Sequence, residues 1–104
     1  MRSTNITGII KQVSEKLKAE NYPFLSIYLF GSFAKKRANK WSDIDVAVVS
    51  DKLKKNKEKN WLLLSKMAKA VDLRIELHAF TSKDFENFND PVVYEIRTTG
   101  VRLA

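Results

Sequence analysis

The sequence predicts a small α+β domain in which a mixed or antiparallel sheet is flanked by helices. Segments with apolar residues at helical spacing alternate with short β-branched or aromatic segments, which is the pattern of such a fold. The length of 104 residues, with 44% hydrophobic and 30% charged residues, suits one globular domain over residues 1–104. The chain has no cysteine, and no apolar run approaches the roughly 20 residues that span a bilayer. We therefore expect a cytoplasmic protein with no disulfide scaffold, no thiol nucleophile and no membrane partner.

The first half of the chain is predicted to form one helix and two strands. Residues 4–20 carry isoleucine, valine and leucine at spacings of three and four, which predicts an amphipathic helix capped by Ser3 or Thr4. Residues 24–30 and 43–49 are apolar runs rich in aromatic or β-branched side chains, as buried strands are.

The second half continues the alternation. We expect a helix over residues 57–70 and a strand over residues 71–80, where polar and apolar side chains alternate. Residues 81–84 have the spacing of a capping box ahead of a short helix. An Asp-Pro pair predicts the start of a last helix over residues 90–99, and residues 101–103 form a terminal strand or tail.

The charge balance favours polyanionic partners. The chain has 19 Lys and Arg against 12 Asp and Glu, a net charge of +7. Five of the lysines lie within residues 52–59, which indicates either contact with a polyanion or a solvated loop and helix start. No aromatic residue interleaves with these lysines, so nucleic-acid binding there would be independent of sequence and strongly dependent on salt.

Two carboxylates lie at the start of the second strand. Asp43 and Asp45 are two residues apart, so both point to one face of the strand, about 7 Å apart by strand rise. Like charges at this range repel, and a hard divalent ion such as Mg²⁺ relieves the repulsion. The pair alone is equally consistent with an exposed strand that binds no metal.

A Gly-Ser pair follows the first strand. Gly31 permits close approach of the backbone to a ligand, and Ser32 precedes a helical turn expected over residues 33–37, whose free N–H groups attract anions. The alternative is an ordinary glycine turn with a serine cap. Gly31 tolerates alanine only if its φ is negative.

These motifs together are more specific than either alone. The Gly-Ser pair, ten intervening residues and Asp-x-Asp on the next strand resemble the signature of the DNA polymerase β-like nucleotidyltransferase superfamily. The similarity is greatest to the minimal nucleotidyltransferase (MNT) domains of bacteria and archaea, over residues 28–34 and 42–48, and it extends to residues 95–101. One departure is Lys36, where many members have glycine.

The resemblance implies the polymerase β-like palm fold and Mg²⁺-dependent transfer of a nucleoside monophosphate, AMP first of all, from a nucleoside triphosphate to an acceptor hydroxyl. By that resemblance Gly31, Ser32 and Lys35 hold the triphosphate, while Asp43 and Asp45 bind two Mg²⁺ ions. Further basic residues of the loop add positive charge beside the phosphates: Lys36, Arg37 and Lys40.

The family uses a third carboxylate from a neighbouring strand, as both a catalytic residue and a metal ligand. Asp72 and Glu76 are the two candidates on one face of the strand over residues 71–80. If this strand is antiparallel to the Asp-x-Asp strand, its later residues meet the aspartates, which favours Glu76. Arg74 then lies between the candidates, and pairs with both or reaches a phosphate. His78 shares the face but is interpreted as a structural hydrogen-bonding residue.

The resemblance also implies partners. A helical protein of the HEPN type, in a toxin–antitoxin pair, or a second copy of the chain would supply the acceptor. The alternative is a non-catalytic nucleotide- or partner-binding module of the same fold, but no carboxylate of the motif has been lost. Trp41 either packs in the core or stacks on a base, and core packing is favoured.

Overall fold

The computed structural model describes residues 5–39 and 42–104. Its elements in chain order are α1 (Ile6–Ala19), β1 (Ser26–Phe30), β2 (Ile44–Val49), the 3₁₀ helix η1 (Asp51–Lys54), α2 (Lys57–Val71), β3 (Ile75–Phe80), the 3₁₀ helix η2 (Asp84–Glu86), α3 (Pro91–Thr99) and β4 (Val101–Arg102). The expectations for Ser3, Thr4, Lys40 and Trp41 lie outside the described residues.

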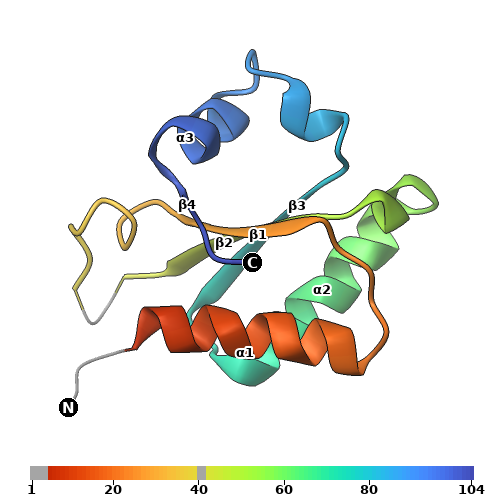
Figure 1. The fold of residues 1–104 in the computed structure, drawn as a ribbon, viewed down its shortest axis with the longest axis horizontal. Helices are drawn as coiled ribbons and strands as arrows, with labels where there is room; N and C mark the ends of the chain where they lie inside the picture. Colours follow the sequence, from red (N-terminus) through yellow and green to blue (C-terminus); the bar gives the residue numbers. More distant parts are fainter. Residues whose placement is uncertain (1–4, 40–41) are drawn as a thin grey trace.

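The strands form one four-stranded mixed sheet in the order β3-β2-β1-β4. Strand β1 is antiparallel to both β2 and β4, whereas β2 and β3 are parallel. Helices α1 and α2 cover one face of the sheet, and α3 with η2 covers the other (Figure 1). The predicted α+β class, with a mixed sheet flanked by helices, is confirmed.

Alternating side chains of β2 divide between two apolar clusters, one on each face of the sheet. The cluster shared with α1 and α2 receives Ile44, Val46 and Val48. The cluster shared with η2 and α3 receives Ala47 and Val49. By the same alternation Asp45 belongs to the α3 side, where it stands at the end of an otherwise apolar row.

Local capping signals explain where several elements begin. Asp90 caps α3 by accepting a hydrogen bond from the Val92 N–H, and proline occupies the first helical position, as predicted. Thr81 and Asp84 exchange reciprocal side-chain to backbone hydrogen bonds, so the capping-box prediction is confirmed. Helix α1 begins later than expected, because Asn5 caps it by accepting from the Gly8 N–H.

Three expectations about the sheet and its connections are wrong. Consecutive turns cover residues 31–36, so they begin before residue 33 and end before residue 37, the bounds expected for a helical turn. The strand expected from residue 71 begins at Ile75, because α2 continues to Val71 and a turn follows. Strands β2 and β3 are parallel, not antiparallel, because α2 carries the chain back across the sheet before β3 begins.

Among the described residues, no helix has both the length and the apolar character needed to cross a membrane.

Candidate active site

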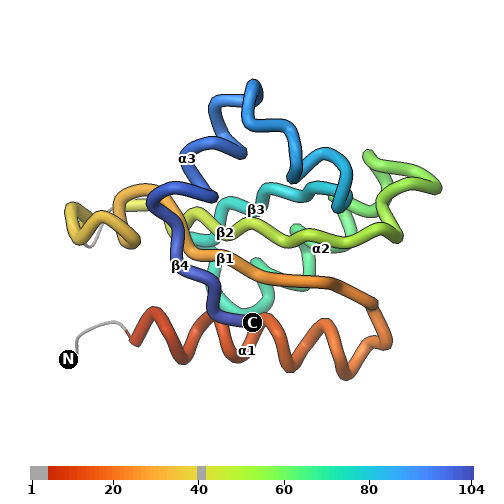
Figure 2. The backbone as a smooth tube through the Cα atoms, turned by 45° about the horizontal axis from the view of Figure 1, so that its top comes forward, coloured from red at the N-terminus to blue at the C-terminus, as the bar shows by residue number. Residues whose placement is uncertain are grey.

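The site lies at the end of the sheet where β1 stops and β2 starts. Asp45 of β2 is in register with Phe30 of β1 on one side and with Glu76 of β3 on the other. Figure 2 shows the three strands side by side, with the chain leaving β1 at this end into the turns of residues 31–36. The parallel register therefore brings two carboxylates directly opposite each other.

A third side chain joins these carboxylates. His78 is two residues after Glu76 and points to the same face of β3. Its Nε2 lies 3.6 Å from Asp45 Oδ1 and 3.9 Å from Glu76 Oε1. One ligand atom from each of the three residues lies within 4.8 Å of the other two, which is compact enough for a single metal ion. Glu76 is the most exposed of the three, so the group opens to solvent on its side.

The electrostatics of Asp45 are unfavourable without a cation. Burial raises the pKa of Asp45 above its ordinary value of 3.8, and the negative charges of Glu76 and Asp43 raise it further, while His78 opposes them. The carboxylate is thus partly desolvated beside like charges. A divalent cation would reverse the sign of this interaction.

Gly31 fits closely against the same carboxylate. Its φ is +74°, a left-handed conformation that residues with a Cβ adopt only under strain. A Cβ built on Gly31 would overlap Asp45 Oδ2 and lie 3.1 Å from Asp45 Cγ. Alanine was expected to be tolerated only if φ were negative, and φ is positive. Glycine is therefore needed here both for the left-handed backbone conformation and for the space that Asp45 occupies.

The other residues of the expected set lie around this group. Asp43 is exposed and directly precedes β2, and its carboxylate is not one of the three clustered groups. Ser32 is half-buried in the turn, where its carbonyl oxygen accepts a hydrogen bond from the Arg37 N–H at 2.9 Å. Lys35 Nζ forms an exposed ion pair with Glu95 Oε2 of α3 at 3.2 Å, which a phosphate group could replace because such pairs contribute little.

The structure separates Asp72 from the site. Its carboxylate accepts hydrogen bonds from the Arg74 backbone N–H at 2.9 Å, from Arg74 Nε at 3.1 Å and from Arg74 Nη2 at 2.8 Å. These bonds lower the pKa of Asp72 below its ordinary value. The expectation that Asp72 shares a strand face with Glu76 is therefore wrong, as is the first of the two alternatives for Arg74, pairing with both carboxylates. Polar and apolar residues alternate in the sequence from residue 71 onward, but residues 72–74 form a turn before β3 begins.

Sequence reasoning left His78 outside the catalytic set. Two signals could have placed it there: it is the only histidine of the chain, and it shares the face of β3 with Glu76. The sequence did not reveal the parallel register of β2 and β3, which places Asp45 opposite Glu76 and Ala47 opposite His78.

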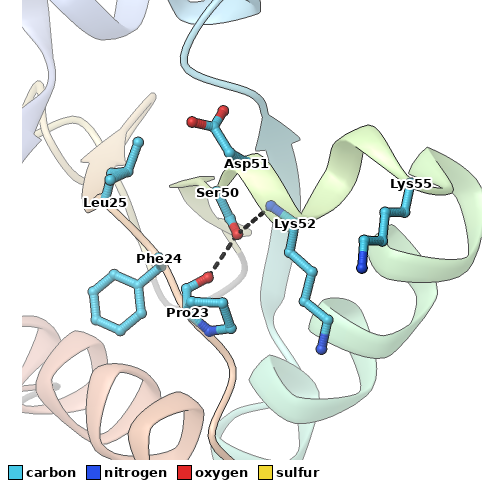
Figure 3. Close-up of a pocket in the computed structure, with 7 residues that line it drawn as sticks. All are labelled: Pro23, Phe24, Leu25, Ser50, Asp51, Lys52 and Lys55. Atoms are coloured by element: carbon cyan, nitrogen blue, oxygen red, sulfur yellow. Dashed lines mark hydrogen bonds between the residues drawn. The ribbon is translucent and has the colours of Figure 1, made fainter.

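A hollow of about 440 Å³ lies at the opposite end of β2 (Figure 3). Ser50, the residue after β2, donates a hydrogen bond to the Pro23 carbonyl oxygen at 2.6 Å and accepts one from the Lys52 N–H at 3.3 Å. These bonds satisfy the buried hydroxyl, and the hollow contains none of the three clustered side chains. Its lining consists of Pro23, Phe24, Leu25, Ser50, Asp51, Lys52 and Lys55.

Comparison with known proteins identifies the family. The family model of the nucleotidyltransferase domain matches residues 10–100, which include the Gly31 turn and all three clustered residues. No curated protein matches the chain. Among solved structures, the fold resembles that of a candidate nucleotidyltransferase from Sulfolobus solfataricus, with a TM-score of 0.63 and 18% identity over 92% of this chain and 77% of that one. The chain therefore belongs to the nucleotidyltransferase domain family.

Proposed function

We propose that the protein is a Mg²⁺-dependent nucleotidyltransferase that moves AMP from ATP to an acceptor hydroxyl. The observation that carries the proposal is the pairing of Asp45 with Glu76 in register across β2 and β3, with Gly31 packed against Asp45. Family membership supports nucleotidyl transfer in general. The oxygen donors support a hard divalent ion, and AMP follows from the likeness to MNT domains.

The roles of the residues follow from their positions. Asp45 and Glu76 would hold the metal, and the exposed Asp43 would join them once nucleotide is bound. The donor set fits a cation, because the parallel register places the two carboxylates opposite each other and His78 Nε2 lies 3.6 Å from an oxygen of one and 3.9 Å from an oxygen of the other. When bound, two Mg²⁺ ions would neutralise phosphate charge and lower the pKa of the acceptor hydroxyl.

The triphosphate would lie over the turn that follows β1. Gly31 lets the backbone approach a phosphate, because no side chain projects there. Ser32 offers a hydroxyl, and Lys35 offers a charge when it leaves Glu95. The basic side chains of Lys36 and Arg37 are exposed on the same turn and add to the field that attracts the anion.

The acceptor would come from another molecule. We propose a helical partner of the HEPN type, as in a toxin–antitoxin pair, because MNT domains are the relatives that the motifs resemble. Leu62 and Leu63 of α2 are exposed, at 48% and 40%, which supports a protein partner for this face. A second copy of the chain is the other acceptor to test.

The experiment measures transfer and binding separately. The protein is incubated with each of the four nucleoside triphosphates labelled at the α-phosphate, with Mg²⁺, and with or without the product of an adjacent gene. We expect label on the partner from ATP and release of pyrophosphate, both lost in Asp45→Asn. Nucleotide binding without pyrophosphate release under every condition would contradict the proposal and favour the non-catalytic binding module.

A further inference from the structure

His78 has no role in the function proposed so far, yet its imidazole nitrogen lies between the two carboxylates. Nε2 is shielded from solvent and has no hydrogen-bond partner among the described residues. Buried polar atoms are nearly always paired, so an unpaired one needs an explanation. The ring itself is held in place, because its edge packs against Phe30 with the ring centroids 4.9 Å apart.

The two distances from Nε2 do not describe hydrogen bonds. They are 3.6 Å to Asp45 Oδ1 and 3.9 Å to Glu76 Oε1, both beyond the roughly 2.7–3.2 Å of an N–H···O bond. They do match the spacing of ligands around one ion. Two atoms that each lie about 2.1 Å from a metal are separated by roughly 3.0–4.2 Å, depending on the angle at the ion.

The donor set also indicates which ion is preferred. Carboxylate oxygens alone suit both Mg²⁺ and Mn²⁺, whereas an added imidazole nitrogen favours ions of the first transition row, among which Mn²⁺ binds most weakly, over Mg²⁺. A metal position with two carboxylates and one imidazole therefore differs in ion preference from an all-oxygen position, such as one formed by Asp43 with Asp45.

We propose that His78 is a metal ligand, and that the position it forms with Asp45 and Glu76 selects a transition ion such as Mn²⁺ over Mg²⁺. The inference rests on the proposed function, since it assigns one of the two metal positions of that site. To the proposed function it adds a nitrogen ligand, His78, and a preference for one kind of ion at that metal position. The second position, beside Asp43, keeps its oxygen ligands and takes Mg²⁺ with the nucleotide.

The test is spectroscopic and uses the full chain. Mn²⁺ is added to the wild-type protein without nucleotide, and electron spin echo envelope modulation is recorded with protein carrying ¹⁴N-histidine or ¹⁵N-histidine. Because the chain has one histidine, a directly coordinated histidine nitrogen can only be that of His78. We expect nitrogen modulation on bound Mn²⁺ that changes with the isotope.

Matched variants give a second readout by calorimetric titration. In His78→Gln we expect the Mn²⁺ affinity to fall by at least about 10–100-fold, the loss typical when a residue that only supports a metal ligand is changed, with the Mg²⁺ affinity nearly unchanged. Asp72→Asn, whose carboxylate is paired with Arg74 away from the site, is the control and should bind both ions as the wild type does.

The outcomes separate this inference from the function on which it rests. One result would overturn the role of His78 and leave the nucleotidyltransferase proposal intact. In it, Mn²⁺ binds the wild type and not Asp45→Asn, but the bound Mn²⁺ shows no histidine modulation. Absence of binding of either ion to folded wild-type protein, with and without a non-hydrolysable ATP analogue, would overturn both.

Discussion

Asp45 and Asp72 are both half-buried carboxylates near β3, yet their surroundings shift their pKa values in opposite directions. Asp45 is desolvated beside Glu76, and its pKa is raised. Asp72 accepts three hydrogen bonds from Arg74, and its pKa is lowered. Asp72 therefore stabilises the turn between α2 and β3, whereas Asp45 is held at the expense of stability, as residues of functional sites often are.

The largest expected effect is on catalysis. Asp45→Asn and Glu76→Gln should each lower metal-dependent AMP transfer by more than about 100-fold, equivalent to about 2.7 kcal/mol in the activation barrier. Asp72→Asn should retain most of the activity, because Asp72 lies outside the site. Label transfer from ATP at a fixed protein concentration measures all three, and comparable losses in Asp72→Asn and Asp45→Asn would remove the distinction between the two regions.

A substitution at Gly31 should damage the Asp45 region through its backbone. Gly31→Ala forces a Cβ into the left-handed region and against the Asp45 carboxylate, so we expect the free energy of unfolding to fall by about 1–3 kcal/mol. Urea unfolding of the purified variant measures it. Unchanged stability would mean that the turn adopts another conformation and that its contact with Asp45 is dispensable.

The two aspartates should differ in the sign of their effect on stability in the absence of metal. The folded pKa of Asp45 is above 3.8, so its charge opposes folding at neutral pH and this penalty disappears as the pH falls below that value. Asp45→Asn should therefore raise the free energy of unfolding at pH 7 by about 0.5–2 kcal/mol.

Asp72 should show the reverse. Its folded pKa is below 3.8, so its charge stabilises the fold above that value and the benefit is lost as the pH falls through the lowered pKa. Asp72→Asn should lower the free energy of unfolding at pH 7 by about 1–2 kcal/mol, with no effect in strong acid. Urea titrations of both variants between pH 3 and pH 7 measure these trends, and effects of the same sign would contradict the comparison.

The smallest effect is expected at Lys36, within the Gly31 turn but away from Asp45. Its φ of +59° is left-handed, a conformation that glycine adopts without strain. Lys36→Gly should raise the free energy of unfolding by about 0.5–1 kcal/mol, since relief of the left-handed strain exceeds the entropy lost by glycine. If thermal melting shows a loss instead, the lysine side chain contributes contacts that outweigh its backbone strain.

The features that depend on nearby residues could be predicted from the sequence. Asp90 and Pro91 start α3, and Thr81 with Asp84 forms the capping box, because these interactions span only a few residues. The Gly31 motif was recognisable for a similar reason, since its spacing to Asp45 reflects a single connection between two consecutive strands, β1 and β2. Glu76 was predicted as the third carboxylate from an antiparallel pairing, whereas the strands are parallel and their register places Glu76 opposite Asp45.

The features that depend on tertiary pairing could not be predicted. Alternation in the sequence continued through Asp72 and Leu73, although hydrogen bonds to Asp72 fold this segment into a turn and leave Leu73 80% exposed. The position of His78 Nε2 near both carboxylates arises from the alignment of β2 with β3, which no local pattern encodes. Strand direction and register therefore decided which polar residues meet.

We propose that Asp45 and Glu76 form a metal centre whose charges destabilise the metal-free fold. Thermal melting of the wild type, Asp45→Asn and Asp72→Asn, each with and without Mg²⁺, Mn²⁺ and a non-hydrolysable ATP analogue, tests it most directly. Ligands at 100 times their dissociation constant stabilise by about 2.7 kcal/mol, and each kcal/mol raises the Tm of a domain of this size by about 4–8 °C. We expect the wild type and Asp72→Asn to gain this shift, and Asp45→Asn to start from a higher Tm and gain none. A lower starting Tm for Asp45→Asn together with an undiminished metal shift would contradict the account.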